Sequence, residues 1–360
     1  MTRGIGPVLG RQLIGRLLAP SEQIQSLWSK SASELATIEG VGARLVSALQ
    51  ATQLDQVEIL ADECRQQGIK LLCPDDPLWP ESFKSLEDAP LILFVRGDAS
   101  ALNAKPMLSV VGARRATQQG RALTRRWCTY LSNRGVSIVS GMAFGIDAAA
   151  HRGALEGDSP TIAVLGCGLS SLSDEQSAQV DAIAAQGCVI SEFVPSQTAR
   201  PEHFPRRNRI IASLSETTLV MEADVKSGSL ITAHQAAEYG REVLAVPGSV
   251  LSGNHAGCHL LIREGAALIE SADALLYQMG WGSGASDRNQ SKKTYHPASE
   301  KEALILAAMA VEIMHVDALA ESCGLTVPEL SPILLALELQ GVIERLPGSR
   351  YLLAVELEKK

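Results

Sequence analysis

The chain has 360 residues, of which 46% are hydrophobic, and a formal net charge of −8. A chain of this length can bury a large core and is expected to form two or three domains. Its acidic balance argues against a protein that coats nucleic acid indiscriminately, because that binding mode needs a basic surface that releases counterions.

The sequence shows no sign of a membrane segment or a secretory leader. No apolar run approaches the length of a membrane span, and residues 1–10 lack the order of a signal peptide. The seven cysteines stand singly, without a C-x-x-C pair, so neither a disulfide framework nor a zinc site is indicated. We therefore expect a soluble, cytoplasmic protein in a reducing compartment, with no metal, no cofactor and no membrane partner.

Residues 1–70 are predicted to form a helical domain of the helix-hairpin-helix (SAM-like) kind. Two similar phrases, "GIGPVLGRQLIGRLL" (4–18) and "IEGVGARLVSALQ" (38–50), each place a Gly-x-Gly turn before an amphipathic helix. In helix-hairpin-helix units the amides of such turns meet a phosphate at the helix N-terminus. The alternative is that these glycines make tight turns between packed helices.

Residues 71–280 are predicted to form an α/β domain with an extended Rossmann-like, doubly wound parallel sheet. Residues 68–97 are Pro-rich and strand-like, which suggests added edge structure. Continuous apolar runs that alternate with helical stretches then indicate a parallel sheet covered on both faces. The predicted strands are 107–112, 136–141, 161–166, 188–192, 217–223, 242–248 and 266–270.

The end of the chain is predicted to hold a linker and a small domain. Residues 281–298 have the Gly, Ser and charge content of a flexible linker. Residues 299–360 follow the order helix, helix, helix and β-wing, which is typical of a winged helix.

The predicted strand ends carry residues suited to an anionic ligand. In open α/β sheets ligands collect outside the carboxyl ends of the strands. After the first strand of the parallel set, "GARRAT" supplies Gly112, Arg114 and Arg115. After the fifth, Lys226 precedes the turn Ser227-Gly228-Ser229 and a helix over about 230–239, whose free amides and helix dipole favour an anion. A plain strand-to-helix turn is the alternative.

A second basic group lies in "HFPRRNRIIASL". Pro205 suits the first turn of a helix, which places the following arginines near the positive end of the helix dipole. The periodicity points Arg207 partly toward the sheet and leaves Arg206 and Arg209 on a wetter face. Pairing of these arginines with Glu202 and Glu216 alone is the alternative. The candidate ligand contacts here are Phe204, Arg206, Arg207, Asn208 and Arg209.

The basic residues cluster locally although the chain is acidic. Seven basic residues and no acid occur from Lys105 to Ile146, a bias that marks one face. Single-strand binders usually add aromatic platforms to such a groove, and Phe204 is the best stacking candidate, followed by Phe144 and Phe193. With 4% aromatic residues, affinity is expected to depend mainly on phosphate contacts.

Motifs for catalysis are weak or missing in the sequence. Asp147 and His151 are four residues apart on one helical face, but one His and one Asp are too few for a metal, and structural roles are favoured. "GCGLSS" lacks the last Gly of a dinucleotide fingerprint and follows the third strand rather than the first. We therefore expect a phosphate-holding protein that is not an enzyme and has no catalytic residue.

Taken in order, these motifs resemble the bacterial DNA-processing protein A family, also called DprA or Smf. The resemblance covers roughly residues 70–280 through "VGARRAT", "SGMAFGIDAAAH", "FPRRNRIIASLSETTLVMEA", "KSGSLITAHQAAEYGREVLAVPGS" and "GCHLLIREGA". Ala113, His259 and "GLSSLSDEQ" depart from the family pattern, so no contacts are carried over to the loop after the third strand.

The resemblance implies a function for the chain. It implies single-stranded DNA binding, protection of incoming DNA, homodimers and loading of a RecA-type recombinase in natural transformation. The family's DNA contacts would fall on Arg114, Arg207, Asn208, Arg209 and Lys226 with its Ser-Gly-Ser turn. The rival hypothesis is a nucleotide-processing enzyme of the phosphoribohydrolase type, for which Glu222 is the best-placed carboxylate.

The winged-helix tail has the wrong charge for duplex DNA. From Ala298 to Ala354 there are eight acids and three bases, and the third helix, "TVPELSPILLALELQG", has no cation. A winged helix that reads DNA uses Arg, Lys, Asn or Gln on that helix. We therefore expect this domain to contact protein, or its own dimer mate.

Overall fold

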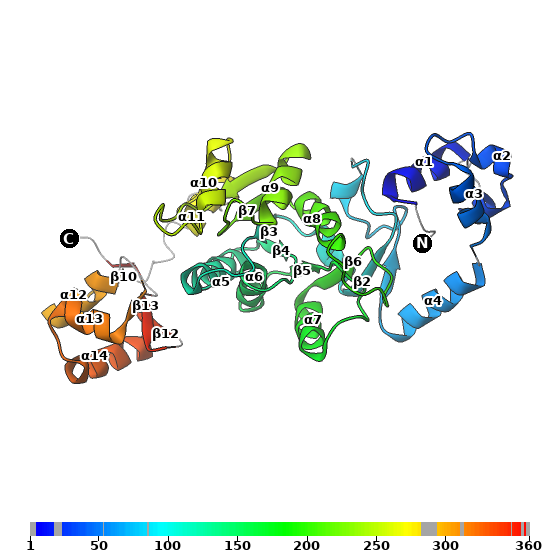
Figure 1. Cartoon of the computed structure of the whole chain (residues 1–360). Helices are drawn as coiled ribbons and strands as arrows, with labels where there is room; N and C mark the ends of the chain where they lie inside the picture. Colours follow the sequence, from blue (N-terminus) through cyan, green and yellow to red (C-terminus); the bar gives the residue numbers. More distant parts are fainter. Residues whose placement is uncertain are drawn as a thin grey trace. The chain divides into compact units, whose positions relative to one another are not determined.

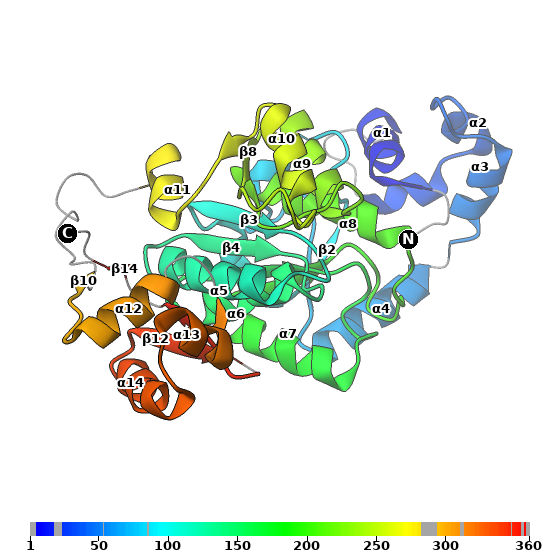
Figure 2. The same cartoon turned by 60° about the vertical axis from the view of Figure 1, so that its left-hand side comes forward.

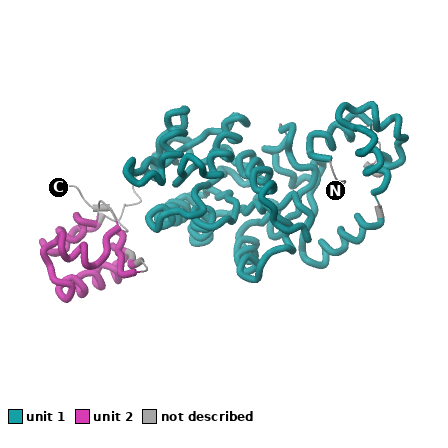
Figure 3. The backbone as a smooth tube through the Cα atoms, viewed as in Figure 1, with its two compact units in different colours: residues 1–281 teal, residues 282–360 magenta. Residues whose placement is uncertain are grey.

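The computed structural model describes residues 5–17, 24–52, 54–84, 86–281, 294–309, 313–346, 348–353 and 356–357. The chain divides into two compact units, residues 1–281 and 282–360 (Figure 3). Most of the predicted linker, residues 282–293, lies outside the described residues. The finer division at residue 70 stays a prediction.

A nine-stranded sheet organises the first unit (Figure 1). Its strand order is β1-β2-β6-β5-β4-β3-β7-β8-β9. Strands β3 to β9 pair in parallel, whereas β1 and β2 add an antiparallel edge, as the strand-like segment 68–97 indicated. The strands are β1 (Lys70–Leu72), β2 (Leu93–Gly97), β3 (Met107–Val111), β4 (Ser137–Ser140), β5 (Thr161–Val164), β6 (Cys188–Ser191), β7 (Thr217–Val220), β8 (Glu242–Ala245) and β9 (Ala267–Leu268).

The strand order reverses beside β3. From β3 the chain proceeds outward through β4, β5 and β6, then crosses back to pair β7 with the other side of β3. The loops after β3 and β7 must therefore separate toward opposite faces. This is the topological switch point at which doubly wound sheets bind ligands. The predicted doubly wound fold is confirmed.

Helices cover both faces of the parallel strands (Figures 1 and 2). Alternate residues of one strand enter different cores: Leu108 packs with Trp127 of α5 and Ile146 of α6, whereas Met107 packs in the core of α8 and α9 that holds Ile211. Two buried faces explain why these strands are continuous apolar runs. The helices are α5 (Gln118–Ser132), α6 (Ile146–Leu155), α7 (Asp174–Gln186), α8 (His203–Leu214), α9 (Ser229–Glu238), α10 (Ala256–Arg263) and α11 (Ala272–Gln278).

The N-terminal segment is helical, as predicted. The helix α3 begins after Gly42, where the phrase 38–50 placed a helix start. These helices share an apolar cluster that includes Leu13, Leu35 and Val46. The elements before the parallel strands are α1 (Pro7–Leu17), η1 (Ile24–Ser29), α2 (Ala32–Leu35), α3 (Ala43–Gln50), α4 (Leu54–Gln66), η2 (Glu81–Phe83) and η3 (Ala99–Asn103).

The second unit has the predicted order of a winged helix. The helix α13 ends at Cys323 because Gly324 takes a left-handed φ of 65°. The antiparallel strands β12 and β13 form the wing, and β11 pairs with β13. The elements are β10 (Thr294–Tyr295), α12 (Glu300–Met309), β11 (Met314–His315), α13 (Val316–Cys323), α14 (Val327–Leu339), β12 (Ile343–Leu346), β13 (Arg350–Leu353) and β14 (Glu356–Leu357).

None of the helices in the described ranges could by itself cross a membrane. The pair α13 and α14 has sufficient length and apolar character when both are counted together, but it is bent by 108°.

Candidate nucleic-acid interface

A cleft with a volume of about 360 Å³ lies at the switch point of the sheet. The loops after β3, β4 and β7 form it together with the first turns of α8 and α9. Eight of the twelve predicted contact residues line this cleft: Gly112, Arg114, Phe204, Arg207, Asn208, Ser227, Gly228 and Ser229. The other four do not line it: Arg115, Arg206, Arg209 and Lys226. Segments far apart in the sequence, from Val111 to Thr232, thus meet in one site.

The loop after β3 is held between two neighbours. The Ala113 amide donates to the Glu222 carbonyl oxygen at 2.7 Å, and the Ala113 carbonyl accepts from the Ile146 amide at 3.3 Å. At Gly112 a Cβ would stand 2.5 Å from Ile146 Cγ1, so glycine is required for this close approach. This packing fixes the backbone from which Arg114 extends. The Arg114 side chain is exposed, and its guanidinium lies over the Phe204 ring, 4.6 Å from the centroid.

Arg207 is buried beneath the cleft. Its side chain points toward the sheet, as expected, and its residue exposure is 4%. Nη1 donates to the carbonyl oxygens of Gly141 and Val164 at 2.5 Å each. Burial lowers the pKa of Arg207, the Asp147 carboxylate opposes that shift, and the like charge of Arg114 adds to it. The guanidinium stays protonated at neutral pH because an arginine pKa begins above 12. Arg207 therefore ties two strand ends together beneath an anion-accepting surface.

Asn208 joins α8 to the Ser-Gly-Ser turn. Its Oδ1 accepts from Arg207 Nε at 3.1 Å, and its Nδ2 donates to the Gly228 carbonyl at 3.4 Å. The turn is less open than the sequence suggested. The Ser227 amide donates to the Asp224 carbonyl at 3.1 Å, and the Ser229 amide to Ser227 Oγ at 3.4 Å. The expectation of free amides is thus wrong for these two residues, because the turn caps itself.

Arg206 and Arg209 face a different carboxylate from the ones considered in the sequence. Glu192, 1% exposed at the end of β6, accepts from Arg206 Nε at 2.8 Å and from Arg209 Nη2 at 2.5 Å. The expectation of a wetter face is wrong for Arg209, which is buried, and the pairing partners are neither Glu202 nor Glu216. The rule that ligands collect outside the carboxyl ends of the strands (the strand-end rule) would have found Glu192, since this residue directly follows β6.

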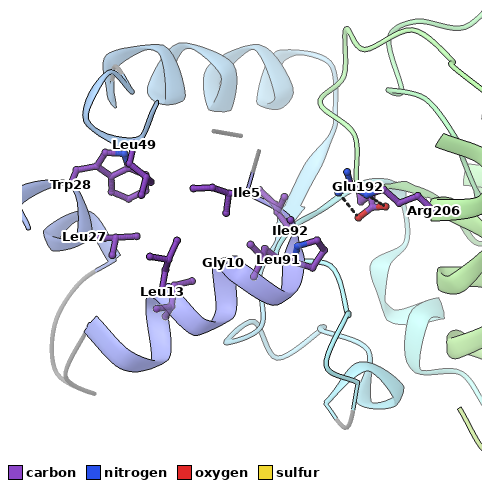
Figure 4. A pocket seen from close by; sticks show the side chains of 13 residues that line it. Ile5, Gly10, Leu13, Leu27, Trp28, Leu49, Leu91, Ile92, Glu192 and Arg206 are labelled. Atoms are coloured by element: carbon purple, nitrogen blue, oxygen red, sulfur yellow. Dashed lines mark hydrogen bonds and ion pairs between the residues drawn. The ribbon is translucent and has the colours of Figure 1, made fainter. Parts of the chain in front are cut away.

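A second cavity explains the position of Arg206. It has a volume of about 170 Å³ and lies between the N-terminal helices and the segment just before β2, at Leu91 and Ile92 (Figure 4). Apolar side chains such as Leu13, Trp28 and Leu91 line most of it, and the Glu192–Arg206 ion pair lies at one end (Figure 4). Arg206 therefore belongs to this cavity and not to the cleft at the switch point.

Lys226 and Arg115 are exposed residues next to lining residues of the cleft. The Lys226 backbone amide donates to Asp224 Oδ1 at 2.6 Å. Two carboxylates that sequence reasoning did not assign to the site, Asp147 and Asp224, also line the cleft. Both follow or flank strand ends, so the same rule could have found them.

Asp147 and His151 have the structural roles that the sequence favoured. Asp147 Oδ2 accepts from the amides of Gly141 and Ala143 at 3.2 and 3.4 Å. Burial raises the pKa of Asp147, and attraction to Arg207 opposes that rise. His151 is fully buried, with Nδ1 2.8 Å from Thr161 Oγ1, and burial lowers its pKa to about 3. The imidazole is therefore neutral in the folded chain at physiological pH.

Glu222 does not face the cleft. Its carboxylate is 1% exposed and accepts from the Thr117 amide at 2.9 Å and the Thr117 hydroxyl at 2.7 Å. A Cβ at Gly120 would stand 2.1 Å from Glu222 Oε2, so the carboxylate is packed against the start of α5. Within the described ranges, no group of three or more His, Cys, Asp or Glu side chains could hold a metal ion.

Two family models match the chain. The model described as DNA recombination-mediator protein A matches residues 70–280, and the DprA winged helix domain matches residues 289–349.

Curated relatives cover most of the chain. Protein Smf of Escherichia coli is 38% identical over 79% of this chain and 77% of its own length. The DNA processing protein DprA of Streptococcus pneumoniae is 38% identical over 68% of this chain and 85% of its own length.

Solved structures agree with the fold. The X-ray structure of DprA from S. pneumoniae superposes with a TM-score of 0.67 at 32% identity, covering 77% of this chain and 94% of that one. DNA processing protein A of Helicobacter pylori, whose structure concerns its single-stranded DNA binding mode, superposes with a TM-score of 0.53 at 26% identity, covering 58% of this chain and 95% of that one. The chain therefore belongs to the DprA/Smf family of DNA recombination-mediator proteins.

Proposed function

We propose that the chain binds single-stranded DNA in the cleft at the switch point. The observation that carries this proposal is the convergence of Arg114, Phe204, Asn208 and the Ser-Gly-Ser turn on one cleft. Cationic and polar groups suit phosphates, and an aromatic ring suits bases. The H. pylori relative, whose structure concerns single-stranded DNA binding, supports the same ligand class.

The proposed contacts remain the twelve residues derived from the sequence, and they differ in where they lie relative to the cleft. The cleft-lining residues form the centre, and Arg115 and Lys226 extend the positive charge at its rim. Arg206 and Arg209 share the single negative charge of Glu192, and Arg209 is buried, so their contribution to binding would be small. The backbone of a single strand would then run past Arg114 toward the turn before α9.

Fluorescence anisotropy with labelled oligo-dT and the matching duplex tests this proposal. We expect oligo-dT to bind at least about tenfold more tightly, a difference of roughly 1.4 kcal/mol. A log-log salt slope of roughly −0.7 per phosphate contact should accompany the binding. Equal affinity for both ligands, or binding to neither, would contradict the proposal.

We further propose a role in recombination, in which the chain protects incoming DNA, forms homodimers and loads a RecA-type recombinase. Family membership supports this role. Light scattering of residues 1–281 at tens of micromolar, roughly the range where −6 to −7 kcal/mol of association appears, tests the dimer. The loading role would be contradicted if adding the chain did not speed the formation of a recombinase filament on single strands that are already coated with protein.

The alternative of a phosphoribohydrolase-type enzyme depended on Glu222, which does not line the cleft. Glu222 is occupied by Thr117 and lies outside the cleft, and Asp147 is occupied by two backbone amides. We therefore propose that the chain holds nucleic acid without chemical catalysis. Measured release of free base from nucleoside monophosphates would overturn this.

A further inference from the structure

One aromatic side chain lines the cleft, and a second follows directly after a residue that lines it. All five phenylalanines lie in described parts of the chain, and Phe83, Phe94 and Phe193 are buried, with exposures of 0%, 1% and 3%. Phe193 stacks on His203 inside the first unit. The remaining two differ: Phe204 is half-buried in the cleft, and Phe144 is 78% exposed. Phe144 directly follows Ala143, which lines the cleft.

The loop that carries Phe144 is held at both sides. Asp147 accepts from the amides of Gly141 and Ala143, which closes the loop upon the start of α6. Gly145 has φ 85°, and a Cβ there would stand 2.2 Å from the Ala113 carbonyl oxygen. The loop therefore packs directly on the backbone that presents Arg114. A large aromatic ring held out to solvent from an anchored loop is not explained by core packing.

Arg114 contacts both the loop that carries Phe144 and the ring of Phe204. Gly145, next to Phe144, would place a Cβ 2.5 Å from the Arg114 carbonyl oxygen, and the Arg114 guanidinium lies over the Phe204 ring. Arg114 thus connects the loop of Phe144 with the ring of Phe204. Ile231 of α9 also lines the cleft and is 42% exposed. Such apolar edges around a cationic group match the alternation of bases and phosphates in a single strand.

We infer that Phe144 is a second base-stacking platform, which holds the nucleobase next to the one on Phe204 while Arg114 contacts the backbone between them. This inference rests on the proposed binding of single strands and assigns one further contact. Every base has a π-face, so the platform accepts any sequence. It would not accept a strand without bases.

The test compares oligo-dT with an abasic oligonucleotide of the same length. Phe144→Ala should weaken oligo-dT binding by at least about fivefold, the lower limit for loss of one base–aromatic stack. It should leave abasic binding and the salt slope unchanged, because Phe144 carries no charge. Phe144→Tyr, which keeps the ring, should restore oligo-dT affinity to within about twofold of the original chain. An unchanged melting temperature confirms that the exposed ring is not needed for folding.

The outcomes separate this inference from the proposed function. If the original chain binds oligo-dT and Phe144→Ala binds it equally well, the platform is wrong and the cleft proposal stands. Equal losses on oligo-dT and abasic strands would likewise overturn stacking. Failure of the original chain to bind oligo-dT would overturn both. A direct readout is Phe144→Trp, whose emission, after subtraction of the four native tryptophans, should be quenched by oligo-dT and unaffected by the abasic strand.

Discussion

The Arg114 guanidinium lies over the Phe204 ring, with Cζ 4.6 Å from the ring centroid. This cation–π contact joins the loop after β3 to the first turn of α8, two segments that are 90 residues apart in the sequence. A guanidinium held over an aromatic ring can still donate N–H groups to a phosphate. Of the two arginines that line the cleft, Arg114 is exposed and Arg207 is buried.

Arg114→Ala should weaken oligo-dT binding for all base compositions and reduce the magnitude of the salt slope by about 0.7, because one phosphate contact is lost. Arg114→Lys should keep the slope but bind less tightly, because an ammonium group lacks the planar fork and the stacking of guanidinium. Anisotropy over a salt series measures both quantities. The matched control is Arg134→Ala, which removes the same charge from a residue whose guanidinium lies over Tyr130, at 3.4 Å from the ring centroid. Equal slopes for Arg114→Ala and the control would contradict the phosphate contact.

Arg207→Ala should reduce stability as well as binding. The substitution removes the donor to the Gly141 and Val164 carbonyls and leaves the buried Asp147 without its cation. We expect the free energy of unfolding to fall by about 2 kcal/mol or more. Urea unfolding measures this loss. The control is Arg115→Ala, at an exposed arginine, for which the free energy of unfolding should change by about 0.5 kcal/mol or less. An unchanged unfolding midpoint for Arg207→Ala would show that the hydrogen bonds from Arg207 to the two strand ends do not stabilise the fold.

His151 should make the fold sensitive to mild acid. Burial lowers its pKa from 6.5 to about 3, so the imidazole stays neutral in the folded chain and becomes protonated in the unfolded chain below pH 6.5. The folded state therefore loses stability as the pH falls from 6.5 toward 3, by roughly 1.4 kcal/mol per pH unit once well below 6.5. Above pH 6.5 this group contributes no pH dependence.

The measurement is urea unfolding from pH 7.5 to 5 for the original chain and His151→Gln. The variant removes the titrating group, so the stability of the original chain should fall more steeply with decreasing pH. Other groups titrate alike in both chains, and the difference between the curves isolates His151. Parallel curves would contradict the assignment of a buried neutral imidazole.

Removal of residues 282–360 should leave oligo-dT affinity within about threefold, roughly 0.65 kcal/mol. The tail is acidic, and α14 offers no cation to a phosphate backbone. Two exposed leucines, Leu335 and Leu339, instead give this helix an apolar surface suited to protein contact. Anisotropy of the shortened chain provides the test. A tenfold loss, or duplex binding by the isolated tail, would contradict the charge argument.

Much of the fold follows from local patterns in the sequence. The apolar runs of β3 to β7 are buried throughout, and sequence pattern alone predicts such burial on two faces. The start of α3 after a glycine turn and the helix–helix–helix–wing order of the tail are likewise local features. The strand-end rule located the cleft because it depends on topology that alternating elements already imply.

Pairing between distant side chains was decided by the tertiary structure alone. The sequence placed Arg206, Arg207 and Arg209 within four residues, yet Arg207 lies beneath the cleft while Arg206 and Arg209 meet Glu192. Helical periodicity gives the direction of a side chain, but it does not identify the residue that the side chain contacts. The contact here, Glu192, follows the strand β6, a different element from the helix that carries the arginines. For the same reason, the sequence could not show that the Glu222 carboxylate accepts from the Thr117 hydroxyl, or that the Phe144 ring is exposed to solvent. Local sequence determined which elements form, whereas the three-dimensional meeting of strand ends determined which charges stay available to a ligand.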